Sequence, residues 1–409
     1  MSKSAIPLLS WVFVCCLLVQ AAGCERLDPE ASYVVRDSAG VRIVESLSPS
    51  WEPGDEWAVA SEPTLSIGQR DGEEAYQFFD VAGAVRFDDG RIVALDRGTK
   101  VVRVFGADGG FLLEFGGAGE GPGEFMSPGE IHRLRPDTLV LWDGGRPGFS
   151  LYTAGGQLIR TLTIDPPGSE RLTGLEPLPD GRFLLETYAS PLTQNPRREV
   201  GIHRDQAPLI LLGADAAILD TVGIFPSTDL AIVRMGGGMG MGMAPFGKAT
   251  WFDTQGDAIV VGTADAMEVS VFNPDGVLEA VFRSTSVDLT VGEEDREWFI
   301  EQFSKRIETP EEREMFGTVV EGMEFPETKA AYGGMLVDPV GNVWLRTGRH
   351  FAPEAPSREW TIFSFQGMLL GTVQMPESFE AYEIGSDYVL GVWEDEMDVE
   401  FVRLYELLK

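Results

Sequence analysis

Short runs of alternating hydrophobic and polar residues recur along most of the chain, separated by turns rich in Gly and Asp. The clearest unit has four such runs, at residues 81–87, 91–95, 101–105 and 111–115. An Asp-Asp-Gly turn separates the first two runs, and an Asp-Gly-Gly turn separates the last two. Alternation with a period of two predicts β-strands, and Asp-Gly turns are typical of hairpins. The unit therefore predicts a four-stranded antiparallel sheet.

Recurrence of this unit predicts a repeat architecture. Four further copies begin near residues 130, 174, 249 and 334, and a last copy at 381–404 has only three strands. We expect residues 64–67 to supply its fourth strand by pairing with 399–404, because a ring closed in this way leaves no sheet edge to aggregate. The sequence thus predicts an all-β fold, a six-bladed β-propeller over residues 63–409 in which an N-terminal strand closes the last blade.

Two segments do not follow the repeat. Residues 33–45 read as an extra hairpin that turns at Ser38-Ala39-Gly40. Residues 290–325 read as a small helical insertion between blades 4 and 5. Thr290 and Glu293 have the spacing of a capping box, and Pro310 marks the start of a second short helix.

A family resemblance supports the fold. The segment Gly119-Glu120-Gly121-Pro122-Gly123-Glu124-Phe125, with Pro128 after it, resembles the interblade signature of NHL-repeat-like six-bladed propeller proteins. Residues 338–344 and 390–396 resemble late blades of uncharacterised bacterial propeller lipoproteins. The resemblance spans roughly residues 33–409. It implies a propeller but no defined activity, because propellers host enzymes, ligand binders and scaffolds alike.

The N-terminus reads as an export signal. Lys3 precedes an apolar run at 6–19, and the small residues Ala21, Ala22 and Gly23 follow it, so residues 1–23 are expected to be a signal peptide. Ala-Ala-Gly followed by Cys24 resembles a lipobox, which implies acylation of Cys24 and anchoring to a lipid bilayer. Ala21 stands where Leu is usual, so ordinary secretion is the alternative.

Export and lipidation predict a place in the cell envelope. We expect residues 24–62 to form a lipidated N-terminal segment, on the periplasmic side of the outer membrane or at the cell surface. Cys15 and Cys16 would leave with the signal, so the mature chain could form no internal disulfide. The chain has 65 acidic and 32 basic residues and a formal net charge of −33, which would repel a phosphate backbone. Nucleic acid is therefore not expected as a partner.

Long loops are predicted on one face only. They are the loops between second and third strands or between blades, at 190–206, 226–245 and 348–358, together with the insertion. Elaborated loops on a rigid scaffold are typical of a binding surface. Basic residues in these loops suggest a pocket for an anionic ligand, and the candidates are Arg97, Lys100, Arg146, Arg349 and His350. Ion pairs with nearby rim glutamates are the alternative explanation for them.

A Gly-rich loop at 235–243 carries four methionines. We expect a flexible loop whose side chains contact an apolar ligand or partner. Coordination of Cu(I) by the thioethers is the alternative.

Catalytic motifs are weak. The sequence has no Gly-x-Ser-x-Gly elbow, phosphate-binding loop or paired cysteines. His132 is expected on a first strand, as a polar residue lining the central channel, and with Glu130 alone it does not make a zinc site. The hypothesis is a binding or scaffold protein for a small anionic ligand, a glycan or a protein partner, without cofactor or metal. The alternative is a propeller hydrolase or lyase that uses channel carboxylates or His132 with a metal.

Overall fold

The computed structural model describes residues 32–409 except 166–170, 189–198, 236–237, 286, 306–308, 310–316, 318, 321 and 348–358. Within this part of the chain the structure is nearly all β, with one longer helix, α2 (Glu293–Ser304). The strands form five four-stranded sheets, one six-stranded sheet and one three-stranded sheet. Cys24 and the predicted signal peptide lie outside the described residues.

The first three four-stranded sheets are consecutive antiparallel units, as the alternating pattern predicts. The first contains β4 (Val81–Arg86), β5 (Ile92–Asp96), β6 (Val101–Phe105) and β7 (Phe111–Gly116). The second contains β8 (Pro128–Arg135), β9 (Thr138–Asp143), β10 (Gly148–Thr153) and β11 (Leu158–Thr163). The third contains β12 (Arg171–Pro177), β13 (Phe183–Tyr188), β15 (Gln206–Leu212) and β16 (Ile218–Pro226).

The later sheets follow the same plan, with additions. The six-stranded sheet contains β19 (Trp251–Gln255), β20 (Ala258–Gly262), β21 (Glu268–Phe272), β22 (Leu278–Ser284), β2 (Val41–Ser46) and β1 (Tyr33–Ser38). The next contains β23 (Met335–Val337), β24 (Val343–Arg346), β25 (Glu359–Phe363) and β26 (Leu369–Gln374). The last contains β27 (Phe379–Ile384), β28 (Tyr388–Glu394), β29 (Glu400–Leu408) and β3 (Ala58–Ile67).

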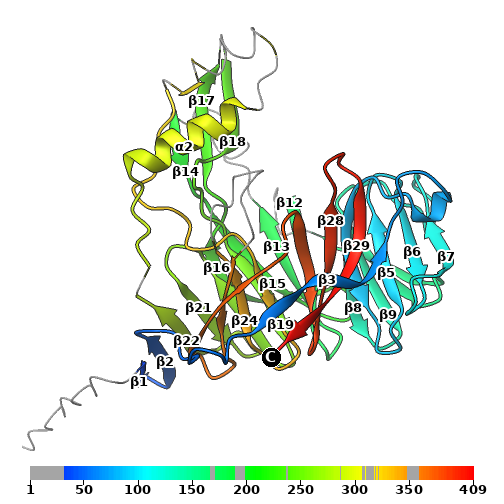
Figure 1. The fold of residues 1–409 in the computed structure, drawn as a ribbon, viewed down its shortest axis with the longest axis horizontal. Coiled ribbons are helices and arrows are strands. Elements are labelled where there is room, and N and C mark those ends of the chain that lie inside the picture. The colour runs from blue at the N-terminus through cyan, green and yellow to red at the C-terminus, as the bar shows by residue number, and fades with distance from the viewer. Residues whose placement is uncertain are drawn as a thin grey trace, which may run out of the picture. The chain divides into compact units, whose positions relative to one another are not determined.

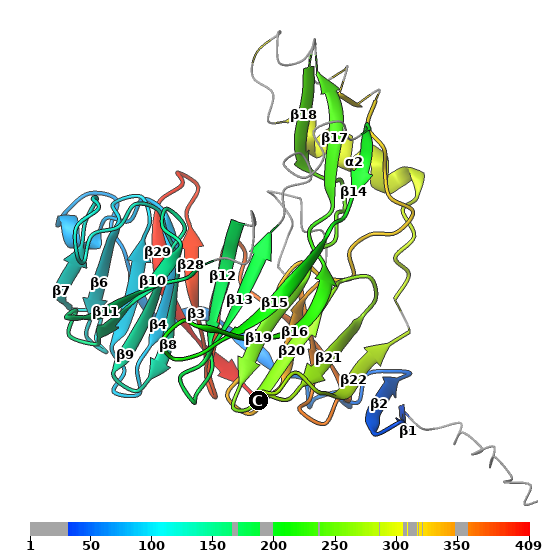
Figure 2. The ribbon, with the colours of Figure 1, turned by 180° about the vertical axis from the view of Figure 1, so that it is seen from behind.

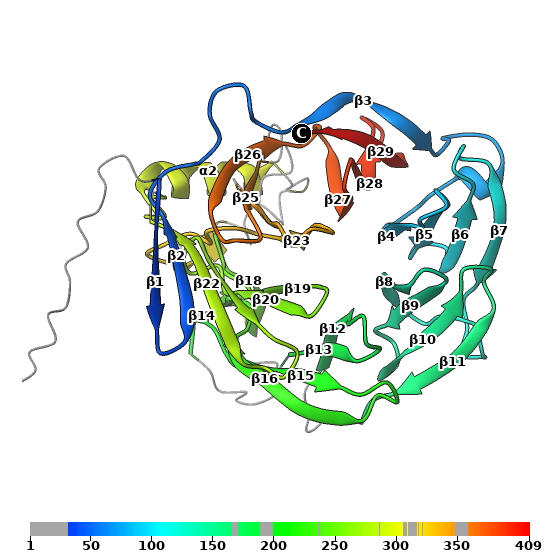
Figure 3. The ribbon, with the colours of Figure 1, turned by 90° about the horizontal axis from the view of Figure 1, so that it is seen from below.

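The sheets are arranged around a common axis (Figure 3). The first strand of each is the innermost, and each contacts the next in the order β4, β8, β12, β19, β23, β27, with β27 in turn contacting β4. Side chains between adjacent sheets form the core, as in the contact of Phe149 with Phe183, whose ring centroids lie 4.5 Å apart. The arrangement is therefore propeller-like.

The predicted pairing of an N-terminal strand with the last sheet is present. β3 runs antiparallel to β29, with Ile67 opposite Val402 and Leu65 opposite Leu404. Ile67 and Val402 are buried, and the hydroxyl of Thr64 donates a hydrogen bond to the carbonyl of Leu404 at 3.0 Å. The chain thus joins its first long strand to its last.

The extra hairpin docks on the six-stranded sheet. β1 and β2 form the predicted hairpin, and β2 pairs in parallel with β22. Arg283 on β22 donates two hydrogen bonds to Glu45, at 2.6 and 3.0 Å, and Val44 is completely buried. The hairpin therefore covers what would otherwise be the exposed outer edge of that sheet.

Two local predictions are wrong. The described residues of the Gly-rich segment 235–243 form strand and not loop, because β17 (Leu230–Met235) pairs antiparallel with β18 (Gly238–Met243). With β14 (Gly201–His203) they make the three-stranded sheet, which projects with α2 from one side of the molecule (Figures 1 and 2). The predicted capping box is also displaced. Helix α2 begins at Glu293. The backbone N–H of Gly292 donates its hydrogen bond to Asp295 and not to Glu293, at 3.0 Å.

Replacing Ile67 by Ala should lower the free energy of unfolding by roughly 2–5 kcal/mol, because it opens a cavity where β3 meets β29. Glu62, on the same strand but exposed, provides the control variant Glu62→Ala, which should change stability little. Denaturant unfolding measures both. Equal effects of the two substitutions would contradict the pairing.

Candidate functional site

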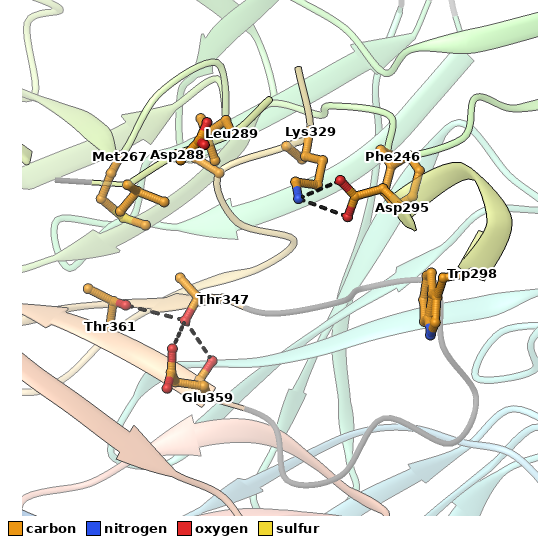
Figure 4. Close-up of a pocket in the computed structure, with 13 residues that line it drawn as sticks. Phe246, Met267, Asp288, Leu289, Asp295, Trp298, Lys329, Thr347, Glu359 and Thr361 are labelled. Atoms are coloured by element: carbon orange, nitrogen blue, oxygen red, sulfur yellow. Dashed lines mark hydrogen bonds and ion pairs between the residues drawn. The ribbon is translucent and has the colours of Figure 1, made fainter. Parts of the chain in front are cut away.

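A cavity of about 290 Å³ lies beneath α2, where the insertion meets the six-stranded sheet and the sheet that follows it (Figure 4). Residues far apart in sequence line it. They are Phe246, Met267, Val287, Asp288, Leu289, Asp295, Trp298, Lys329, Ala330, Ala331, Thr347, Glu359 and Thr361. Specific ligand pockets have volumes of about 300–1,000 Å³, so this one has room for one small molecule.

An aromatic cluster holds α2 in place over the cavity. Phe299 on α2 lies 5.7 Å from Phe246 and 5.7 Å from Phe325, measured between ring centroids. Trp298, the next residue on the helix, is partly buried, and its indole lies near the cavity (Figure 4). One helical turn thus supplies both the residue that anchors the insertion and an aromatic wall of the cavity.

Polar groups occupy defined positions in the lining. Lys329 donates hydrogen bonds from Nζ to both carboxylate oxygens of Asp295, at 2.9 and 3.0 Å. On the opposite side (Figure 4), the hydroxyl of Thr347 lies 3.3 Å from Oε1 of Glu359 and 3.2 Å from the hydroxyl of Thr361. The cavity therefore presents hydrogen-bonding groups on two sides of an apolar space.

The described lining carries more negative than positive charge. Asp288, Asp295 and Glu359 are acidic, and Lys329 is the one basic residue among the described lining residues. The backbone N–H of Thr290 donates a hydrogen bond to Asp288, which lowers the pKa of that carboxyl. This charge favours a neutral or cationic ligand over an anionic one.

A second cluster lines the central axis. His132 on β8 lies between two carboxylates, with Nδ1 3.2 Å from Oε2 of Glu176 and Nε2 3.4 Å from Oε2 of Glu130. Glu176 comes from β12, the neighbouring innermost strand, and its side chain and that of His132 are each about four-fifths buried. Asp253 on β19 adds a third carboxylate, which accepts a hydrogen bond from the backbone N–H of Val337 at 2.6 Å.

This cluster shifts the pKa values of its members. Burial opposes the charged form of His132, but the charge of Glu176 and the hydrogen bond to Glu130 outweigh it and raise the pKa to about 9. Burial raises the pKa of Glu176 to about 8, against the attraction of His132. Burial also raises the pKa of Asp253 to about 6. Groups that titrate near neutral pH in a recess are candidates for acid–base chemistry.

Two of the basic residues predicted as ligand contacts, Arg97 and Arg146, lie away from the cavity beneath α2. Arg97 follows β5 and donates two hydrogen bonds to Asp80, at 2.7 and 2.8 Å. Arg146 follows β9 and donates to the carbonyls of Gly119 and Glu124, at 2.9 and 3.0 Å. Arg146 thus holds the 119–125 segment, which carries the family resemblance. Neither arginine lines the cavity beneath α2.

The other predicted contacts are divided between the described and undescribed parts of the chain. Lys100, with a φ of 59°, immediately precedes β6 and does not line the cavity. Arg349 and His350 lie outside the described residues, in the segment between Thr347 and Glu359, which both line the cavity. Among the described residues, no group of three or more His, Cys, Asp and Glu is placed to hold a metal ion.

Sequence reasoning found the insertion but missed the cavity. Phe246, Trp298 and Lys329 come from three separate stretches of chain, and no short motif connects them. The one available signal was the density of aromatic residues around the insertion, at Trp298, Phe299 and Phe325.

Comparison with known proteins places the fold but not the activity. No protein-family profile matches the chain, and no curated protein matches it. A Bacteroides fragilis protein described as exported matches 90% of this chain and 99% of its own, with 12% identity and a TM-score of 0.51. A DUF4221 family member from Bacteroides vulgatus covers 85% of this chain and 98% of its own, with 10% identity and a TM-score of 0.49.

Solved enzymes occur among the matches as well. Virginiamycin B lyase from Staphylococcus aureus covers 87% of this chain and all of its own, with 10% identity and a TM-score of 0.41. At these identities the likeness concerns the fold alone. The chain is β-propeller-like. In the described part of the chain, no helix has the length and apolar character needed to cross a bilayer.

Replacing Glu176 by Gln should lower the pKa of His132 from about 9, because it removes the nearest negative charge. Glu186→Gln is the matched control, since Glu186 is a partly buried glutamate with a raised pKa of about 7 that is not among the ion-pair partners of His132. With three histidines in the chain, NMR titration of labelled imidazoles resolves each one. An unperturbed His132 pKa of about 6.5 in the unmodified protein would contradict the cluster.

The same titration has a consequence for stability. The folded state raises the pKa of His132 above its usual 6.5, so this contribution is fully present below pH 6.5 and is lost as the pH rises through about 9.

Proposed function

We propose that this chain is an exported six-bladed β-propeller, anchored to the membrane through an acylated Cys24, that binds a small glycan in the cavity beneath α2. The observation that carries the proposal is the cavity itself, which has an aromatic wall, two polar sides and a volume of about 290 Å³. The likeness to a protein described as exported and the lipobox-like segment before Cys24 support the location.

The composition of the lining favours a sugar. The indole of Trp298 offers a flat apolar surface for a sugar ring, and Thr347, Thr361 and Glu359 offer oxygen atoms for its hydroxyl groups. Pockets of this kind combine an apolar wall with a few polar groups that fix orientation. A neutral sugar satisfies those polar groups without placing a charge in the cavity.

The charge of the lining argues against an anionic ligand at this place. Binding a carboxylate would bring a negative charge toward Asp288 and Glu359. The anion-binding alternative depends on Arg97, Lys100, Arg146, Arg349 and His350. Two of these, Arg97 and Arg146, already donate hydrogen bonds within the protein, which leaves them less available to a ligand.

Glucose, glucosamine and glucuronate test the proposal, because they share one ring and differ in charge. We expect calorimetry to detect binding of glucose and glucosamine, with glucuronate at least tenfold weaker. Glu359→Gln should reduce that discrimination, and Glu377→Gln, at an exposed position outside the cavity, should leave it unchanged. Equal or tighter binding of glucuronate would refute a site of this charge.

A second candidate is a hydrolase or lyase at the channel cluster. The close contact of His132 with Glu176, both with a pKa displaced toward the alkaline side, favours it. In this hypothesis the two residues exchange a proton with the substrate. Turnover of a panel of nitrophenyl glycosides that Glu176→Gln abolishes and Glu186→Gln preserves would support it. No turnover, or turnover that Glu176→Gln leaves intact, would exclude it for that substrate class.

A further inference from the structure

Strand β18 carries a regular alternation of glycine and methionine from Gly238 to Met243. Successive side chains of a strand point to opposite faces, so Met239, Met241 and Met243 share one face and the glycines occupy the other. β18 is the last strand in the order β14-β17-β18, so only one of its edges is paired within the sheet. The three thioethers therefore lie in one row along the edge of the projecting sheet.

These methionines are exposed. Their exposed fractions are 44% for Met239, 41% for Met241 and 61% for Met243. Two of the residues that lie opposite them on β17 are buried, in contrast to the methionines. These are Ile232, opposite Met241, and Leu230, opposite Met243. The sheet thus has an apolar, buried centre, with a row of exposed methionine residues beside it.

We propose that Met239, Met241 and Met243 form a binding site for a soft monovalent metal ion, Cu(I). Thioether sulfur is a soft ligand that selects Cu(I) over hard or borderline ions such as Mg²⁺. None of these methionines lines the cavity beneath α2. Metal binding here would therefore be a function in addition to glycan binding.

The spacing of the row suits two-sulfur coordination. Alternate residues of a strand are about 6.6 Å apart, because each residue advances about 3.3 Å. Two metal–sulfur bonds of about 2.3 Å, the length found in zinc thiolate sites, span about 4.6 Å. Methionine is unbranched and has three rotatable bonds. Neighbouring thioethers can therefore approach each other enough to close the gap between the spacing of alternate residues and the span of the two metal–sulfur bonds.

The residues opposite the three methionines indicate which of them contribute most to Cu(I) binding. Arg234 on β17 lies opposite Met239, and its positive charge opposes a cation there. Met241 and Met243 lie opposite the apolar residues Ile232 and Leu230. Met241 and Met243 are therefore the principal ligands, and Met239 contributes less.

Met-to-Leu substitution distinguishes metal binding from apolar docking, because leucine keeps the volume and hydrophobicity and removes the sulfur. The full chain is used with Cys15, Cys16 and Cys24 changed to Ala, because thiolates would otherwise compete for the metal. Anaerobic Cu(I) titration against a chromophoric Cu(I) chelator measures stoichiometry and affinity. Thermal unfolding confirms that each variant folds.

We expect one Cu(I) per chain in this background and at least a tenfold loss of affinity in the triple variant Met239→Leu, Met241→Leu, Met243→Leu. Met243→Leu alone should weaken binding more than Met239→Leu alone. The control Met126→Leu, Met397→Leu removes two exposed methionines elsewhere and should bind Cu(I) as before. Absence of Cu(I) binding, or undiminished binding by the folded triple variant, would overturn the proposal, whatever the outcome with sugars.

Discussion

The pairing of β3 with β29 is the constraint on which the arrangement of the sheets depends. It joins residues about 340 positions apart, as in the hydrogen bond from Thr64 to Leu404. Without β3 the last sheet would present the outer edge of β29 to solvent. Because β27 also contacts β4, the last sheet is held both at its inner strand and at its outer one. The innermost strands β8, β12 and β19 lie next to one another around the axis. This arrangement brings His132, Glu176 and Asp253 together from three sheets.

The cavity beneath α2 depends on a different and smaller set of contacts. The insertion has its own cluster of Phe246, Val291 and Phe299, separate from the cores between sheets. The Lys329–Asp295 pair ties the first turn of α2 to the chain that enters β23. Among the described residues, this cluster has fewer buried members than any of the cores between sheets, and ligand sites are commonly drawn from such less stable regions.

Local patterns predicted the repeated sheets well, because each strand and each turn is determined by residues that are close together in the sequence. In the turn at Asp108, for example, Gly109 takes a φ of 80°, which glycine adopts without strain, and the carboxylate of Asp108 accepts a hydrogen bond from the N–H of Gly110 at 3.0 Å. β18 escaped prediction because glycine disfavours strands and no β-branched residue marks it. The docking of β2 on β22 escaped too, since a parallel partner about 240 residues away leaves no local signal.

The candidate sites were harder to predict for the same reason. His132 and Glu130 lie two residues apart and were visible together, but Glu176 and Asp253 join them only through the contacts of neighbouring first strands. For two of the basic residues the structure gives partners that the sequence did not identify. Asp80 binds Arg97, and two backbone carbonyls bind Arg146. A charged residue in a sequence indicates a polar position, but the fold determines which partner that side chain binds.

Native-state hydrogen exchange of β3 and β29 tests this account most directly. If the two strands are one structural unit with β28, their amides should exchange through one opening reaction, with the same free energy and the same dependence on denaturant. If β3 exchanges in a separate opening of much lower free energy while β28 and β29 stay protected, the N-terminal strand does not hold the last sheet in place, and the account is contradicted.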